Sequence, residues 1–135
     1  MRYTVIITLI IIITLITGCN VKQKQLETMW YKDKFNYHEI NNPKKIMEIK
    51  NILDNIEWKG TEPKDLKNMP DFAFWIGRNS DNIRIIHCDV WRLDSEHFGI
   101  TKFGEEFDTL NRYSIITQTQ FNQILKALGA KGDTF

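Results

Sequence analysis

The stretch PDFAFWIG at residues 70–77 is the part of this sequence that most strongly decides the fold. Its apolar residues alternate, so Phe72, Phe74 and Ile76 share one face of an extended segment. Aromatic and β-branched residues also favour the half-buried surface of a sheet. The stretch is therefore predicted to be a strand with one face in the core.

A second strand is predicted directly after the first. Residues 78–82, RNSDN, have the composition of a turn, and residues 83–92, IRIIHCDVWR, again favour a strand. We expect Ile86, Cys88 and Val90 to form its buried row. The opposite row consists of Ile83, Ile85, His87, Asp89 and Trp91.

Further strands are predicted on both sides of this pair. Residues 26–33 and 35–40 precede it, and the second of these segments alternates between apolar and polar side chains. Two shorter strands are expected near residues 98–103 and 113–116.

The clearest helix start in the chain is Asn42 followed by Pro43. An asparagine can cap the free amides of the first turn, and proline has its φ preset for the first helical position. Apolar residues then recur at helical spacing, which predicts an amphipathic helix over residues 43–55 that lies on a sheet. These residues are Ile46, Ile49, Leu53 and Ile56. We interpret this stripe as core and not as a ligand site.

A second helix is predicted over residues 118–128 near the C-terminus. Thr117 and Gln120 fit a capping box, and Gly129 is a suitable left-handed terminator. Its apolar stripe consists of Phe121, Ile124, Leu125 and Leu128.

This order of elements predicts an α+β fold, with a mostly antiparallel sheet and two helices packed on one face. A chain of 135 residues suits one such domain. The single α+β domain is predicted at residues 26–130, followed by a flexible tail at 131–135.

The N-terminal leader begins with Met1 and the positive charge of Arg2, and residues 3–17 follow without any charge. This apolar run is shorter than the roughly 20 residues that a helix needs to cross the hydrocarbon core of a membrane. Its length is typical of the apolar region of a signal peptide. The alternative interpretation is an uncleaved membrane anchor with an incidental cysteine.

Residues Ile16, Thr17, Gly18 and Cys19 resemble the bacterial lipobox. The resemblance implies a diacylglyceryl group on the Cys19 sulfur and cleavage after Gly18. Residues 1–18 are then a lipoprotein signal peptide and residues 19–25 a lipidated tether, so the α+β domain follows an N-terminal signal peptide. It also implies lipid anchoring on the extracytoplasmic face of the cell membrane, so the lipid on Cys19 makes the membrane the first predicted partner.

Charge and cysteine content limit the other classes of partner. The chain has 18 basic and 17 acidic side chains, and Arg2 belongs to the predicted leader. This balance gives no electrostatic reason to expect nucleic acid as a partner.

With Cys19 lipidated, Cys88 has no partner for a disulfide, so stability is expected to come from packing.

The triplet His87, Cys88 and Asp89 is the most tempting candidate for chemistry. Neighbours on a strand point to opposite faces, so these three side chains cannot converge on one metal ion or one substrate bond. Cys88 would act as a nucleophile only if His38 or His97 approached it. His87 and Asp89 share a face and would need a third ligand, such as His97, to bind a metal. We predict no catalytic residue, no metal site and no cofactor.

An acidic region surrounds the predicted connection between the last strands. Its members are Asp94, Glu96, Glu105, Glu106 and Asp108. The default interpretation is solvated loop charge.

The four tryptophans, Trp30, Trp58, Trp75 and Trp91, are spread along the chain. We expect most of them in the core, with one or two free to form a binding patch on the outer sheet face.

Three groups of residues are similar to the YhfM-like lipoproteins of Gram-positive bacteria. They are residues 46–56 with Trp58, residues 70–72 with 74–76, and residues 113–116 before the last helix. The resemblance implies the α+β fold and the membrane location. It implies no activity, because these are core and turn residues and this family has no established one.

The leading hypothesis from the sequence is a membrane-anchored, non-enzymatic binding or accessory module in the cell envelope. Its partner would be an envelope protein or a small ligand. One alternative is a small envelope hydrolase that uses carboxylates or His97 within residues 92–108. The other is a purely structural component of the envelope.

Overall fold

The computed structural model describes residues 26–33, 36–66, 69–80, 82–104 and 112–131. Its elements follow in the order β1 (Glu27–Lys32), β2 (Tyr37–Ile40), α2 (Pro43–Asp54), β3 (Phe72–Arg78), β4 (Ile83–Arg92), β5 (His97–Phe103), β6 (Tyr113–Thr117) and α3 (Gln118–Leu128). Every strand and helix predicted from the sequence is present, with bounds that differ by at most a few residues. The predicted signal peptide and tether lie outside the described residues.

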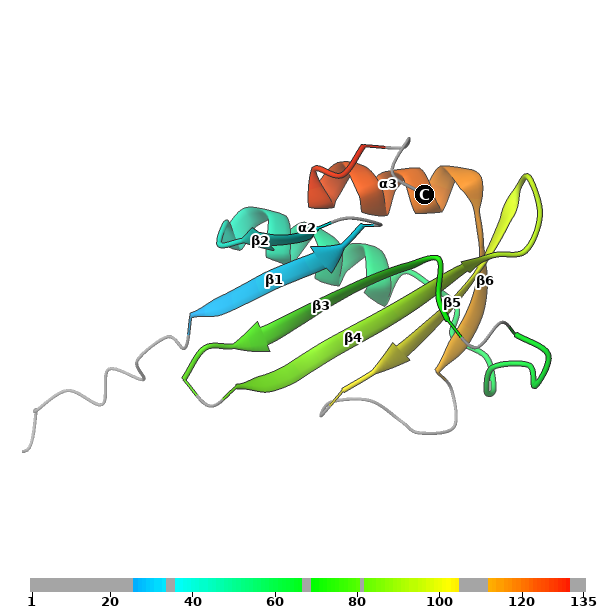
Figure 1. Ribbon diagram of the computed structural model, residues 1–135, viewed down its shortest axis with the longest axis horizontal. Coiled ribbons are helices and arrows are strands. Elements are labelled where there is room, and N and C mark those ends of the chain that lie inside the picture. Colours follow the sequence, from blue (N-terminus) through cyan, green and yellow to red (C-terminus); the bar gives the residue numbers. More distant parts are fainter. Residues whose placement is uncertain (1–25, 34–35, 67–68, 81, 105–111, 132–135) are drawn as a thin grey trace, which may run out of the picture.

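The strands form one six-stranded sheet in the order β2-β1-β3-β4-β5-β6 (Figure 1). All neighbours in this sheet are antiparallel, which confirms the predicted sheet type. The chain leaves β2 at one edge and returns through α2 to place β3 on the other side of β1. The strands predicted from residues 70–92 therefore occupy the two middle positions of the sheet.

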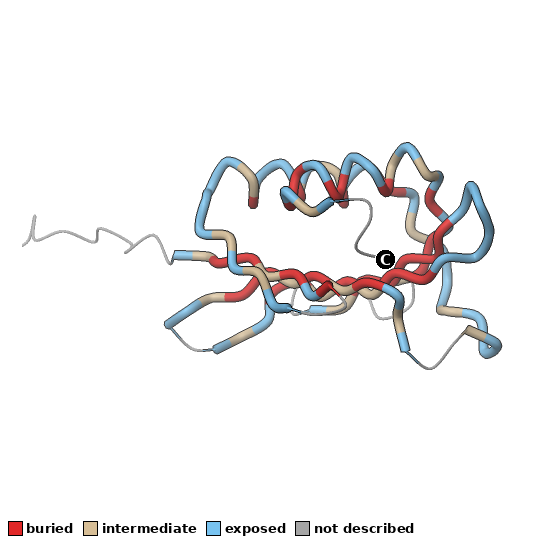
Figure 2. The backbone as a smooth tube through the Cα atoms, turned by 45° about the horizontal axis from the view of Figure 1, so that its top comes forward, coloured by how far each residue is buried: buried red, intermediate tan, exposed pale blue. Residues whose placement is uncertain are grey.

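Both helices pack on the same face of the sheet and against each other (Figure 2). The predicted stripes of both helices are buried in the core cluster between the two layers. Phe74 of β3 stands opposite Tyr31 of β1 and Cys88 of β4 in this layer. The core thus consists of the inward-facing side chains of the strands and the apolar stripes of both helices, as predicted.

Local capping interactions fix where the helices begin and end. The Asn42 side chain accepts a hydrogen bond from the Lys44 amide at 3.0 Å, with Pro43 as the first helical residue. Thr117 and Gln120 form the predicted capping box, and Gly129 ends α3 with a φ of 71°. These contacts confirm the helix signals found in the sequence.

One predicted row of β4 is wrong at its N-terminal end. The register with β3 shifts between Ile76 and Gly77, so Ile86 pairs with Ile76 but Arg84 pairs with Gly77. This bulge inserts one residue into β4, and Ile85 is buried in the core cluster instead of lying on the outer face with His87. The bulge also puts Arg84 on the outer face, where the simple alternation did not place it.

Gly104 lies against this bulge. Its φ is +152°, and a Cβ atom at this position would stand only 1.9 Å from the carbonyl oxygen of Ile85. The end of β5 can therefore approach the bulge closely only because residue 104 has no side chain.

Candidate functional site

The sheet face opposite the helices carries a row of rings. Trp30, Trp75, His87 and Phe103 stand side by side on β1, β3, β4 and β5 in the register of the sheet. Successive ring centroids are 6.3, 6.1 and 6.4 Å apart. We call these four residues the aromatic row. Three of the four tryptophans, Trp30, Trp75 and Trp91, thus lie on the outer sheet face, two of them in this row, so the expectation that most tryptophans lie in the core is wrong.

The other two tryptophans have different surroundings. Trp58 follows α2 and packs against the core, and its indole nitrogen donates a hydrogen bond to the Leu53 carbonyl at 3.0 Å. Trp91 belongs to the outer row of β4 but is buried beside Pro63 and Leu66 of the connection between α2 and β3. The residues of the aromatic row, in contrast, stay partly open on the outer face.

A groove of about 430 Å³ lies next to the aromatic row. Its lining includes Lys32, Tyr37, Met69, Ala73, Trp75, Arg84 and His87. We call this site the outer groove. Ala73 stands on the outer face of β3 between Lys32 of β1 and Asp89 of β4, where its small side chain leaves space above the sheet. Tyr37 and Met69, which are 67% and 75% exposed, are the most open apolar side chains of the lining.

Two basic side chains of the outer groove lie over aromatic rings. The Arg84 guanidinium is 5.0 Å from the centroid of the Trp75 ring, and the Lys32 ammonium is 5.5 Å from that of Tyr37. In the part of the chain that the structure describes, neither Arg84 nor Lys32 forms an ion pair with a carboxylate. Their charges remain available to a ligand, and the rings hold them in place.

His87 and Asp89 lie on the same face, as predicted, with Nε2 and Oδ1 2.9 Å apart. The proposed third metal ligand, His97, does not join them. His87 pairs with Phe103 at one end of β5, whereas His97 begins that strand and contacts Asp94 at 3.0 Å. Among the described residues, no group of three or more His, Cys, Asp or Glu side chains is arranged to hold a metal ion.

Cys88 points into the core, away from His87 and Asp89. Its side chain is fully buried, with Phe74 opposite it on β3 and Lys102 opposite it on β5. Burial raises the pKa of the Cys88 thiol far above its ordinary value. His38 is engaged instead with Asp33, at 2.6 Å. Cys88 therefore stays protonated and acts as a small core residue.

The burial of Cys88 predicts a loss of stability at alkaline pH. Because the pKa of the folded thiol is raised, the unfolded chain releases this proton above roughly pH 8.5 while the folded chain keeps it. The free energy of unfolding should then fall by up to about 1.4 kcal/mol per pH unit through this residue. Urea denaturation of wild type and Cys88→Ala at pH 7.5, 8.5 and 9.5 measures the effect. Equal pH slopes for the two proteins would contradict it.

The acidic region does not form a paired carboxylate site in the described residues. Asp94 accepts hydrogen bonds from the backbone amides of Glu96 and His97 at 2.7 and 2.8 Å, and these bonds lower its pKa. This arrangement is that of an exposed turn. A hollow of about 300 Å³ includes Asp94 but neither Glu96 nor His97. The remaining members, Glu105, Glu106 and Asp108, lie outside the described residues.

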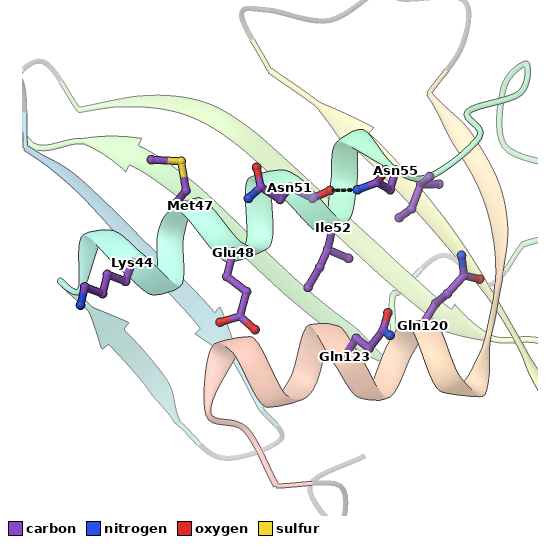
Figure 3. Close-up of a pocket in the computed structure, with 9 residues that line it drawn as sticks. Lys44, Met47, Glu48, Asn51, Ile52, Asn55, Gln120 and Gln123 are labelled. Carbon is purple, nitrogen blue, oxygen red and sulfur yellow. Dashed lines mark hydrogen bonds between the residues drawn. The ribbon is translucent and has the colours of Figure 1, made fainter.

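A second groove, of about 370 Å³, lies between α2 and α3 (Figure 3). Met47 and Ile52 supply its apolar surface, and the carboxamides of Asn51, Gln120 and Gln123 line it. It contains no nucleophile beside a base among its described residues. Its polar groups are neutral amides apart from Lys44 and Glu48 near one end.

Sequence reasoning missed Arg84, Lys32, Tyr37 and Ala73 as neighbours in one site. The alternation of side chains along each strand could have shown that Lys32, Tyr37 and Ala73 lie on the same side of the sheet. No local signal showed that β1 stands between β2 and β3. The predicted lipidation residue, Cys19, and the cleavage position after Gly18 lie outside the described residues.

Comparison with protein-family models, with curated proteins and with solved structures found no match to this chain. Within the residues that the structure describes, no helix has both the length and the apolar character needed to cross a membrane. Function is therefore inferred from the residues and their geometry.

Proposed function

We propose that this protein is a membrane-anchored, extracytoplasmic lipoprotein whose domain is a non-enzymatic binding module for a small ligand. The observation that carries the proposal is the outer groove. It combines exposed apolar surface with two basic side chains that no described carboxylate neutralises. Small-molecule sites typically have this composition, with a mostly apolar lining and a few placed polar groups.

The residues of the leader support the membrane location. Ile16 to Cys19 have the order of a lipobox, and residues 3–17 have the length of the apolar region of a signal peptide. β1 begins at Glu27, shortly after the polar tether. An extended chain spans about 3.5 Å per residue, so a domain lipidated at Cys19 would stay close to the membrane. Membership of the YhfM-like lipoproteins is part of this proposal.

Binding is favoured over catalysis by the contents of the outer groove. Its described lining has one histidine, His87, which is bonded to Asp89, and no Ser, Thr or Cys nucleophile. The thiol of Cys88 lies on the opposite face of the same strand. A general acid or base must lie within hydrogen-bond reach of the group whose proton it transfers. The described lining holds no such nucleophile beside His87, so binding is favoured.

A groove-filling variant tests the binding proposal. Ala73→Leu adds a branched side chain to the floor of the outer groove, on the solvent side of the sheet. We expect a protein-free extract of the cell envelope to raise the melting temperature of the wild-type domain by several degrees, since a ligand at 100 times its Kd adds about 2.7 kcal/mol. The extract should leave the melting temperature of the Ala73→Leu variant unchanged. Thermal unfolding with and without fractions of the extract measures both.

The matched control is Met47→Leu in the groove between the helices. It should respond to the extract as wild type does. If no fraction stabilises wild type, or if Ala73→Leu is stabilised equally, the outer groove is not the binding site.

A further inference from the structure

The charges that line the outer groove are not equally available. Asp33 accepts hydrogen bonds from the Asn36 amide at 2.7 Å and contacts His38 at 2.6 Å. Asp71 accepts a hydrogen bond from the Arg92 amide at 2.8 Å, and Asp89 contacts His87. The nearby carboxylates thus have partners within the protein.

The basic groups have no such partners in the described chain. Lys32 and Arg84 contact aromatic rings, and the one further contact of Arg84 is a long one of 3.5 Å to Nδ1 of His87. A guanidinium presents several donors in one plane and binds a carboxylate or a phosphate through two parallel hydrogen bonds. The available charge of the groove is therefore positive and suits an anion.

The apolar surface of the groove suits a ring with an apolar face. Tyr37 and Trp75 meet edge to face, with centroids 5.9 Å apart and planes at 70°. Met69 lies on the rim and Ala73 on the floor. Such a corner can pack against the C–H face of a sugar. A volume of about 430 Å³ is enough for a small ligand but not for a protein segment of typical interface size.

From these observations we infer that the outer groove binds an anionic sugar, that is, a sugar ring that carries a carboxylate or a phosphate. This inference rests on the proposed binding function and names its ligand class. The aromatic corner holds the ring, and the Arg84 guanidinium, which lies over Trp75, holds the anionic group. The sugar is either free or one unit of an anionic envelope polymer.

Titration of the folded domain with four small probes tests the ligand class. The probes are glucuronate, glucose 6-phosphate, glucose and inorganic phosphate, followed by NMR of the indole and backbone amide signals. Either anionic sugar should bind at least about tenfold more tightly than glucose, since a charge-assisted contact adds that factor. Either should also bind more tightly than phosphate alone, since only the sugars offer a ring to Tyr37 and Trp75. The signals that shift should include the Trp75 indole.

Two variants separate the charge from the ring. Arg84→Gln should remove most of the preference for the anionic sugar over glucose, whereas Lys126→Gln on the exposed side of α3 should not change it. Tyr37→Ala should weaken the binding of the anionic sugar and the binding of glucose by a similar factor, about fivefold. A tetramer of the uronate that binds like the monomer indicates a free sugar, and a tetramer that binds about tenfold more tightly indicates a polymer.

Several results would overturn the inference. One is phosphate binding as tightly as glucose 6-phosphate, since the ring would then contribute nothing. Another is uridine monophosphate binding more tightly than both anionic sugars, which would indicate a nucleotide site. If an envelope extract stabilises wild type but not Ala73→Leu while none of the anionic sugars binds, the ligand class is wrong and the binding function stands.

Discussion

Cells that produce the Cys19→Ala variant are expected to accumulate an unprocessed precursor without lipid. Alanine has no nucleophilic sulfur to accept the diacylglyceryl group, and lipoprotein signal peptidase cleaves after lipidation. Two acyl chains bind a membrane stably because each buried CH₂ contributes about 0.8 kcal/mol. Metabolic labelling with an alkyne fatty acid, together with gel mobility, measures lipidation and processing in a bacterial host.

The second cysteine provides the control for this experiment. Cys88→Ala should be labelled and processed like wild type, because Cys88 is buried in the core of the domain. Normal labelling and cleavage of Cys19→Ala would show that Ile16 to Cys19 are not a lipobox. Loss of label in both variants would instead indicate that the label depends on the folded domain, which is also contrary to the proposal.

Phe74→Ala is expected to lower the free energy of unfolding by about 3–5 kcal/mol. Phe74 has no exposed surface and lies on β3 in the middle of the sheet, where it contacts the ring of Phe72. Removing the ring leaves a cavity that the surrounding strands and helices can close only in part. A domain of this size has roughly 5–15 kcal/mol of stability in total. Urea denaturation followed by circular dichroism measures the loss.

A control substitution on the surface separates packing from a general effect of mutation. Ile115 is an apolar residue of β6 that is 57% exposed on the outer face. Ile115→Ala should lower the free energy of unfolding by less than about 1 kcal/mol, because much of the Ile115 side chain is already exposed to water in the folded protein. Equal losses for the two variants would contradict the assignment of Phe74 to the core.

Much of the fold was predictable because its signals are local. Asn42, Pro43, Thr117, Gln120 and Gly129 fixed the helix ends by hydrogen bonds within a few residues of each position. Alternation along residues 70–77 fixed which side of the strand enters the core. The same reasoning failed at Ile85, because a bulge depends on how β4 pairs with β3 and not on β4 alone.

The candidate site was predictable only in part. Alternation placed His87 and Asp89 on one face and Cys88 on the other, as the structure confirms. It did not place Tyr37 beside Trp75, since those residues come from β2 and β3, with β1 between them in the sheet. It also missed Arg84, which faces the groove because of the bulge.

The sequence alone thus determined the elements and, apart from Ile85, their buried faces. It also predicts a site of lipid attachment at Cys19. Each of these depends on residues that are neighbours along the chain. The tertiary structure alone decided the strand order, and with it the aromatic row and the outer groove. The physical reason is that the groove is built from cross-strand neighbours such as Lys32 and Ala73, whose contact depends on the pairing of β1 with β3. No pattern within a single strand contains that pairing.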